Sequence, residues 1–200
     1  MGAATHDEVT LSASQQRVLT TVMQRKSVFF TGAAGTGKSH VLKVLRGVLE
    51  GLGLISKVSF TAPTGVAACN IRGMTIHSWA GCGIAKESKE QLAAQVGRSR
   101  TASLRWKEAE VLIVDEISML SAELFDKLSY IGQKVRQDDR PFGGLQVILC
   151  GDFYQLPPIG VGKCVGGYRM YRGGCTHTSI SVGTSTSYPP LALVSVWGVI

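Results

Sequence analysis

The chain has 200 residues, a formal net charge of +7, a sequence pI near 9.3 and 44% hydrophobic residues. This length suits one α/β domain plus a remnant and leaves no room for a second such domain, while the basic charge favours a polyanionic partner without proving one. The five cysteines form no C-x-x-C pair and are odd in number, which argues against a zinc site or a disulfide framework, so we expect reduced thiols in a soluble intracellular protein.

The first predicted element follows an N-terminal arm at residues 1–10, which lacks the apolar region of a secretory signal. The sequence LSASQQRVL from residue 11 predicts an N-capped amphipathic helix. Its Gln15 amide offers both a donor and an acceptor and could pair with both edges of an adenine. Spacing alone leaves that role undecided.

Four apolar runs rich in β-branched residues predict the strands of a sheet. Near-continuous hydrophobicity is typical of strands that are buried on both faces, and the helix-like segments between the runs fit right-handed βαβ crossovers. We therefore predict an α/β fold, with a parallel sheet and helices on both faces, over residues 11–159. Ligands of such sheets bind at the carboxyl ends of the strands. The predicted strands are Val28–Thr31, Val58–Ala62, Val111–Val114 and Val147–Cys150.

The first run leads into a glycine-rich segment that matches G-x-x-x-x-G-K-[ST] and precedes a helix-like sequence. Glycines let successive backbone N–H groups turn toward phosphates, and the helix directs its positive end at the same charge. Lys38 would reach the β- and γ-phosphates, and the Ser39 hydroxyl would ligate Mg²⁺. A flexible turn is the alternative, but the flanking strand and helix favour a nucleoside-triphosphate site. The segment is Gly32, Ala33, Ala34, Gly35, Thr36, Gly37, Lys38 and Ser39.

The second run ends in TAPTGVAA, which opens a helix, so Thr64 and the amides near Gly65 could grip an anion. Because the phosphate loop already binds the nucleotide, a nucleic-acid phosphate is the simplest candidate for the anion at Thr64 and Gly65. His77 and Trp79 could add a polar contact and a stacking face, the latter worth about 1–3 kcal/mol per base. The alternative is a buried tryptophan with a histidine satisfied in the core.

The basic segment Lys86 to Lys107 predicts a solvated helix and loop, with nucleic-acid contact as the alternative. The third run then ends in Asp115 and Glu116. At the sheet edge, Asp115 can hold the Mg²⁺ shell and Glu116 can polarise the attacking water. Such a pair also stabilises helix N-termini, but the phosphate loop elsewhere in the chain favours catalysis.

The charged segment Gln137 to Gly144 predicts a surface turn before the fourth run, which ends in CGDFYQLPP. Asp152 and Gln155 stand where a group could sense the γ-phosphate. An amide such as Gln155 can hydrogen-bond both a phosphate oxygen and the lytic water. A proline-terminated strand end is the alternative.

Residues 160–200 have a different character, with eight glycines, nine serines or threonines and no acidic residue. We predict an irregular, poorly ordered tail with a short strand near Leu191–Val196. The apolar stretch Leu191 to Ile200 is shorter than the roughly 20 residues that span a bilayer, so no membrane association is expected.

Together these motifs resemble the Pif-one family of superfamily-one DNA helicases over residues 11 to 158. The matching stretches are LSASQQRVL, FFTGAAGTGKS, TAPTGVAACNIRGMTIHSWAG, LIVDEISML and GDFYQLPP. The resemblance implies a RecA-like P-loop lobe of a Mg²⁺-requiring, ATP-dependent motor that moves five-prime to three-prime on single-stranded DNA. It also implies roles in DNA repair, recombination and telomere maintenance, in the nucleus or, by family, the mitochondrion.

The chain departs from the family after Pro158, where a second RecA-like lobe with an arginine finger is expected. Loss of such a finger costs about 10³–10⁵ in turnover. We therefore predict that this chain alone binds nucleotide weakly and unwinds nothing. Two alternatives remain: a non-catalytic nucleotide- or DNA-binding fragment, and a related helicase of the recombination or conjugation type.

Overall fold

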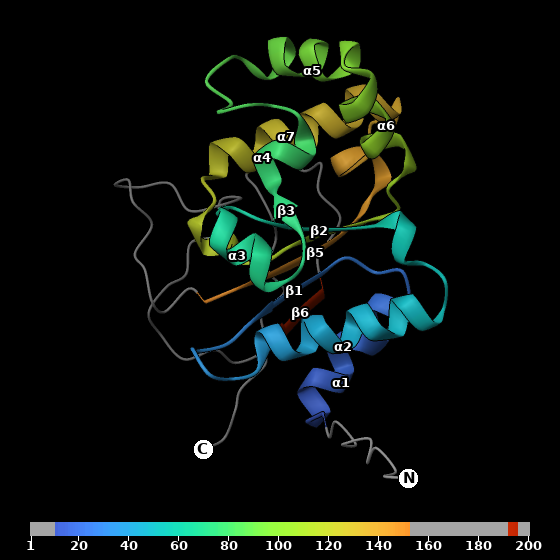
Figure 1. The fold of residues 1–200 in the computed structure, drawn as a ribbon, viewed down its shortest axis with the longest axis vertical. Helices are drawn as coiled ribbons and strands as arrows, with labels where there is room; N and C mark the ends of the chain where they lie inside the picture. The colour runs from blue at the N-terminus through green and yellow to red at the C-terminus, as the bar shows by residue number, and fades with distance from the viewer. Residues whose placement is uncertain (1–10, 153–191, 196–200) are drawn as a thin grey trace, which may run out of the picture.

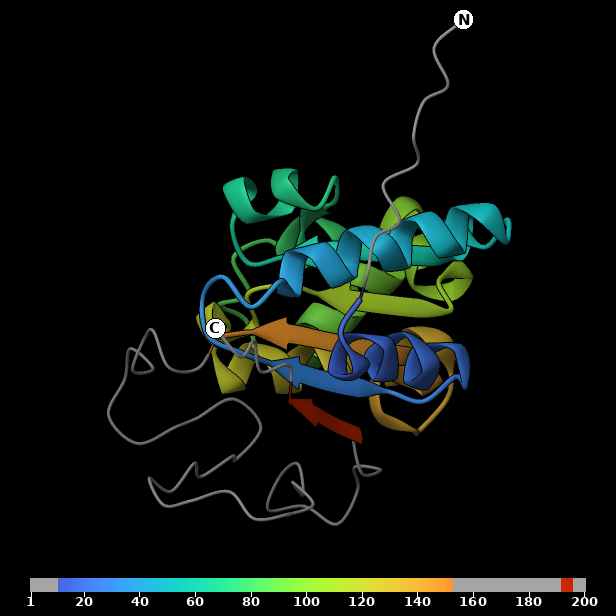
Figure 2. The same cartoon turned by 90° about the horizontal axis from the view of Figure 1, so that it is seen from below.

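The computed structural model describes residues 11–152 and 192–195. A parallel sheet of six strands lies between two groups of helices (Figure 1, Figure 2). The strand order is β3-β2-β4-β5-β1-β6, so the central strands come from distant parts of the sequence. The strands are β1 (Val28–Thr31), β2 (Val58–Ala62), β3 (Met74–Thr75), β4 (Val111–Val114), β5 (Gln146–Gly151) and β6 (Ala192–Ser195).

The two faces of the sheet form separate apolar cores. Phe30, Ile113 and Ile148 point toward one group of helices, and their strand neighbours Phe29 and Leu112 point toward the other, as period-2 alternation requires. The first group is α1 (Ala13–Met23), α2 (Lys38–Gly51) and α3 (Gly65–Asn70). The second group is α4 (Ile76–Ala80), α5 (Lys89–Arg98), α6 (Arg100–Glu108) and α7 (Ala122–Arg136). Three short 3₁₀ helices complete the described chain: η1 (Ile55–Lys57), η2 (Ile117–Met119) and η3 (Pro141–Gly144).

Local sequence explains where the helices begin. Among the α-helices of the described chain, all but α2 start after a serine or threonine whose side-chain oxygen accepts an N–H of the first turn. Helix α2 instead follows Gly37, which has a φ of 84° and no side-chain cap. The amides at the start of α2 are therefore left for another acceptor.

The predicted strands agree closely with the structure. The first three runs match β1, β2 and β4 residue for residue, and β5 extends the fourth run by one residue at each end. The short strand expected near Leu191–Val196 is confirmed as β6, which pairs in parallel with β1. The sheet therefore takes one strand from beyond residue 159. The rest of the predicted tail and the arm at residues 1–10 lie outside the described residues.

Two predicted surface segments instead contribute to the core. Within Lys86 to Lys107, Leu92, Val96 and Trp106 are fully buried on one face of α5 and α6. Within Gln137 to Gly144, Phe142 is buried and packs edge-on against Phe125, with ring centroids 4.9 Å apart. The predicted solvent exposure was wrong for these residues, because the many charged residues around them hide the few apolar ones that are buried. Within the described residues, no helix is both long and apolar enough to cross a membrane.

Candidate nucleotide site at the carboxyl edge of the sheet

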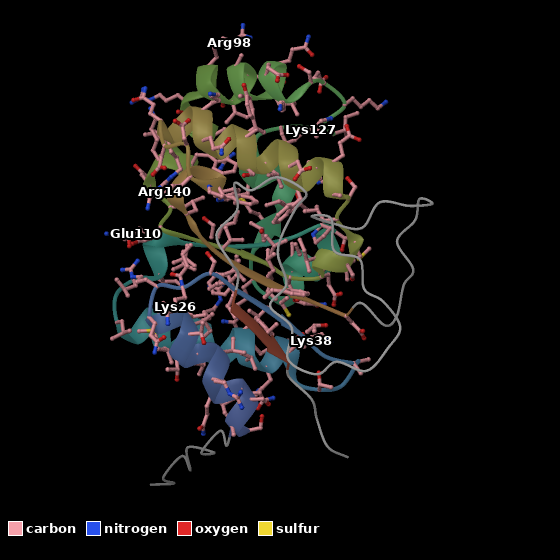
Figure 3. All side chains as sticks on the ribbon, turned by 180° about the vertical axis from the view of Figure 1, so that it is seen from behind. Lys26, Lys38, Arg98, Glu110, Lys127 and Arg140 are labelled. Carbon is pink, nitrogen blue, oxygen red and sulfur yellow. The ribbon has the colours of Figure 1, made fainter. Side chains whose placement is uncertain are left out.

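The order of the strands brings three distant segments to one edge. Strand β5 pairs in parallel with both β1 and β4, so the segments that follow these strands meet at their carboxyl ends. These segments are the phosphate loop, the Asp115–Glu116 pair and Asp152. Figure 3 shows Lys38 at this end of the sheet, whereas Lys26, Glu110 and Arg140, which precede β1, β4 and β5, lie toward the other end.

The phosphate loop is a compact turn around the amine of Lys38. Its Nζ donates to the carbonyl oxygens of Gly32 (2.6 Å) and Ala33 (3.0 Å). Gly35 and Gly37 have φ values of 80° and 84°, a conformation that side chains rarely adopt. With the uncapped start of α2, this arrangement presents backbone N–H groups and one ammonium group to a polyanion.

The acidic pair follows β4 in a strained turn. Asp115 is 4% exposed, and its Oδ1 accepts the N–H of Glu116 at 2.9 Å. Glu116 has left-handed backbone angles (φ 51°, ψ 41°), which are uncommon for a residue with a side chain and are found at functional sites. Burial first, and then the charge of Asp115, raises the pKa of Glu116, while Lys38 opposes the rise. Lys38 and Asp115 therefore both lie close enough to Glu116 to affect its pKa.

Sequence reasoning did not identify two further residues of this edge, Cys150 and Gly151. Cys150 is fully buried, and burial followed by the charge of Asp115 raises the pKa of its thiol. Gly151 packs against the turn that holds Glu116. Their position directly before Asp152 was the only signal in the sequence.

Gln15 lies at the phosphate loop. Its Nε2 donates to the carbonyl oxygen of Thr36 at 3.2 Å, and its Oε1 accepts the N–H of Ser12 in the capping box of α1. The amide therefore joins the start of α1 to the loop. The adenine contact remains a prediction.

Thr64 and His77 lie together at the same edge. Thr64 caps α3 by accepting the N–H of Ala67 at 3.3 Å, and Gly65, the first residue of α3, is exposed. Thr64 and half-buried His77 line a pocket of about 370 Å³ with Met119. The structure thus groups three of the four predicted DNA contacts at the carboxyl ends of β2 and β3.

The prediction that Trp79 offers a stacking face to a base is wrong. Its side chain is 2% exposed, its Nε1 donates to Ser59 Oγ at 2.8 Å, and its ring lies 4.5 Å from that of Trp106. The tryptophan belongs to the core, because α6 covers the ring. Gln155 lies outside the described residues.

The donor set fits a metal that is shared with a nucleotide. Within residues 11–152 and 192–195, no three His, Cys, Asp or Glu side chains are grouped as metal ligands. Mg²⁺ is commonly held by one or two carboxylates with substrate phosphates and water. Asp115 with the hydroxyl of Ser39 suits that pattern.

Comparisons with known proteins agree with this geometry. A family model described as PIF1-like helicase matches residues 10–164. The chain belongs to the PIF1-like helicase family. The ATP-dependent DNA helicase PIF1 of Saccharomyces cerevisiae is 48% identical over 151 residues, which are 76% of this chain and 18% of that protein. This membership favours the Pif-one resemblance over a helicase of the recombination or conjugation type.

Solved PIF1-like structures share the fold. The crystal structure of Pif1 helicase from Candida albicans has a TM-score of 0.76 and 36% identity, covering 96% of this chain and 40% of that one. The Bacteroides Pif1 helicase in complex with ADP-AlF3 and ssDNA has a TM-score of 0.62 and 32% identity, covering 76% and 34%. The chain therefore spans less than half the length of the PIF1-like proteins it matches.

Proposed function

We propose that this chain forms the first RecA-like, nucleotide-binding lobe of an ATP-dependent DNA helicase. The observation that carries the proposal is the meeting of Lys38, Asp115 and Glu116 at one edge of the sheet. A phosphate loop and an acidic pair at the carboxyl ends of β1 and β4, the two parallel strands on either side of β5, are the parts that phosphoryl transfer to water requires. Family membership supports the same activity.

Each residue has a role in ATP hydrolysis. Lys38 and the loop amides bind the phosphates, and Asp115 with Ser39 holds Mg²⁺, which neutralises phosphate charge when bound. Glu116 orients and deprotonates the attacking water, and its raised pKa brings it closer to the range where a general base works well. Gln15 contacts the adenine, and Gln155 senses the γ-phosphate.

The second substrate is single-stranded DNA. Exposed Gly65 follows Thr64, which lines a pocket with half-buried His77 and with Met119 of the turn after Glu116, so DNA bound there would lie beside the acidic turn. The Bacteroides relative, whose structure contains ssDNA, supports this assignment. Movement from five-prime to three-prime, roles in repair, recombination and telomere maintenance, and nuclear residence rest on the family resemblance alone.

Two measurements test the proposal. A fluorescent ATP analogue should bind the chain weakly in the presence of Mg²⁺. Phosphate release, followed with the chain in excess over ATP, should be slow, rise with single-stranded DNA and disappear in Glu116→Gln, which keeps nucleotide binding. Nucleotide binding without any phosphate release would favour the alternative of a binding module. Absence of nucleotide binding would overturn both readings.

A further inference from the structure

The carboxylate of Asp115 lies between two hydrogen-bond donors. Its Oδ1 accepts the N–H of Glu116 at 2.9 Å. The second is the thiol of Cys150 on the neighbouring strand, whose pKa is raised by burial first, then by the charge of Asp115 and by hydrogen bonding to it. Cys150 and Gly151, the last two residues of β5, are in contact with Asp115 or with the turn after it. Neither belongs to the phosphate loop or to the acidic pair.

Cys150 is fixed by the register of three strands. Val114 of β4 is paired with Leu149 of β5, so the next residues, Asp115 and Cys150, face each other across the two strands. On its other side Cys150 is paired with Phe30 of β1. The thiol is completely buried in the apolar core beneath α1 and α2. After burial itself, the Asp115 carboxylate has the largest effect on the pKa of this thiol.

Gly151 leaves room for the turn that carries the first donor, the N–H of Glu116. A Cβ at this position would be 2.9 Å from Ile117 Cγ2, 3.2 Å from the Ile117 nitrogen and 3.3 Å from the Ser118 nitrogen. These atoms belong to the turn that starts at Glu116. A side chain at Gly151 would therefore force Ile117 or its backbone to shift, and we expect the N–H of Glu116, one residue earlier, to shift with it.

We propose that Cys150 and Gly151 are positioning residues that orient the Asp115 carboxylate for Mg²⁺-ATP. This inference rests on the proposed function, in which Asp115 is a ligand of the magnesium ion. Neither residue touches the nucleotide. Donors behind a metal ligand fix its orientation, and their loss commonly costs about 10–100-fold in metal affinity.

The test separates nucleotide affinity from magnesium dependence. A fluorescent ATP analogue is titrated into the full chain in EDTA and again over a series of Mg²⁺ concentrations. Cys150→Ala should leave binding in EDTA unchanged and raise the Mg²⁺ concentration needed for half of the enhancement about 10-fold. Cys150→Ser keeps a donor and should recover most of this loss. Gly151→Ala should behave like Cys150→Ala.

Matched controls exclude a general loss of packing. Cys82→Ala removes another buried thiol, which contacts the carbonyl oxygen of His77 and not Asp115, and Gly47→Ala adds a methyl group where nothing lies within 4 Å. Both should keep the wild-type magnesium dependence. Thermal unfolding reports folding of each variant. If Gly151→Ala does not fold, adding Ile117→Leu removes the Cγ2 atom in its way, and Cys150→Ala tests the proposal by itself.

The outcomes are distinguishable. If the wild-type chain binds the analogue without any magnesium enhancement, the assigned role of Asp115, and with it the proposed function, fails. If the wild-type chain shows the enhancement and Cys150→Ala retains it in full, the positioning role is overturned. A loss in Cys150→Ala that Cys150→Ser does not recover also contradicts it, because packing and not the donor would then be responsible.

Discussion

The two ends of the parallel sheet use charge in opposite ways. At the amino end, charges are paired: Glu110 accepts hydrogen bonds from Lys57 and from Arg25 at 2.6 Å, and these bonds, that of Lys57 first, lower its pKa. At the carboxyl end, Lys38 donates to carbonyl oxygens of the phosphate loop and not to a carboxylate. There the charge of Asp115 raises the pKa values of Glu116 and Cys150, and the charge of Glu116 adds to the rise at Cys150. The first end stabilises the fold, and the second keeps its charge for a ligand.

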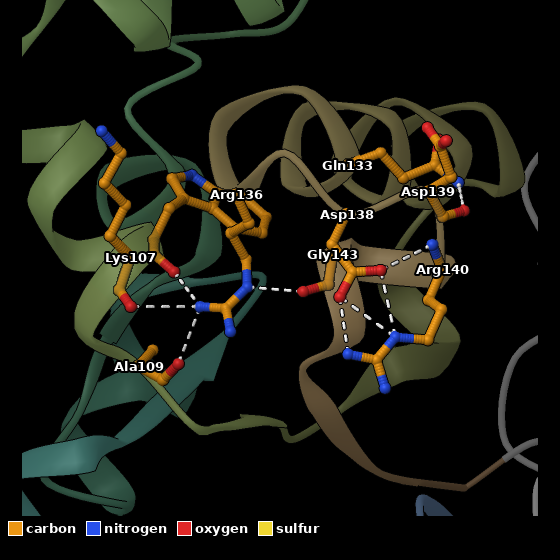
Figure 4. A network of polar contacts seen from close by, with 9 residues as sticks. Lys107, Ala109, Gln133, Arg136, Asp138, Asp139, Arg140 and Gly143 are labelled. Atoms are coloured by element: carbon orange, nitrogen blue, oxygen red, sulfur yellow. Dashed lines mark hydrogen bonds and ion pairs between the residues drawn. The ribbon is translucent and has the colours of Figure 1, made fainter.

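Arg136 shows how fully the backbone carbonyl groups near the amino end of the sheet are hydrogen-bonded. At the end of α7 its guanidinium donates to the carbonyl oxygens of Trp106, Lys107 and Ala109 at the end of α6, and to that of Gly143 in η3 (Figure 4). One side chain thus caps α6 and joins three elements. Substitutions at the two ends should therefore have separate effects.

The largest expected effect is on ATP binding in Lys38→Ala. The substitution removes the ammonium group inside the phosphate loop, and we expect at least a roughly 100-fold loss of affinity, or about 2.7 kcal/mol. The free energy of unfolding should change by less than about 0.5 kcal/mol, since Lys38 is only half-buried and Ala33, one of its two carbonyl partners, is exposed. Titration of a fluorescent ATP analogue and denaturant unfolding measure the two quantities. Lys43→Ala, one turn further along α2, is the matched control and should bind normally.

Arg136→Met should have the reverse effect. It leaves several half-buried carbonyls without their donor, and we expect the free energy of unfolding to fall by about 2 kcal/mol. ATP affinity measured where the variant is folded should match that of the wild type. Arg140→Met, which removes an exposed guanidinium nearby, serves for comparison. A large loss of ATP affinity in folded Arg136→Met would show that the two ends are coupled.

The smallest effect concerns the exposed pair Asp138–Arg140. Hydrogen bonds from the Arg140 side chain and backbone lower the pKa of Asp138 from 3.8 to about 2. Because this pKa is lowered in the folded state, the pair stabilises the protein above pH 3.8 and loses its effect as the pH falls toward 2. Asp138→Asn should therefore be slightly less stable than the wild type at pH 6, with the difference vanishing near pH 2 in urea unfolding. A difference that persists at pH 2 would contradict the assignment.

Sequence patterns predicted the structure best where a residue type at a given position has a single physical explanation. Buried parallel strands are continuous apolar runs, so β1, β2 and β4 were predicted to the residue. The phosphate loop and acidic pair were found because their chemistry needs particular residues at the end of a strand. Trp79 was predicted wrongly because a tryptophan suits a base or a core equally, and only the presence of Trp106 across from it decides.

The rest depended on distant pairings. Strand β3 has two residues, which are too few for a periodic pattern in the sequence. It forms because its backbone pairs with the edge of β2. Gly151 and Cys150 look like ordinary strand residues until the register places them against Ile117 and Asp115. The sequence contains these residues but not the three-dimensional proximity that gives them a role.

The strand order also constrains how the protein is made. The strand that carries the phosphate loop is synthesised well before its partner β5, which follows about 120 residues later, as the pairing of Val28 with Ile148 shows. Contacts this distant in sequence form slowly and cannot form before the later segment has left the ribosome. ATP capture should therefore appear only after β5 has emerged, which makes nucleotide binding a late marker of completed folding on a nascent chain.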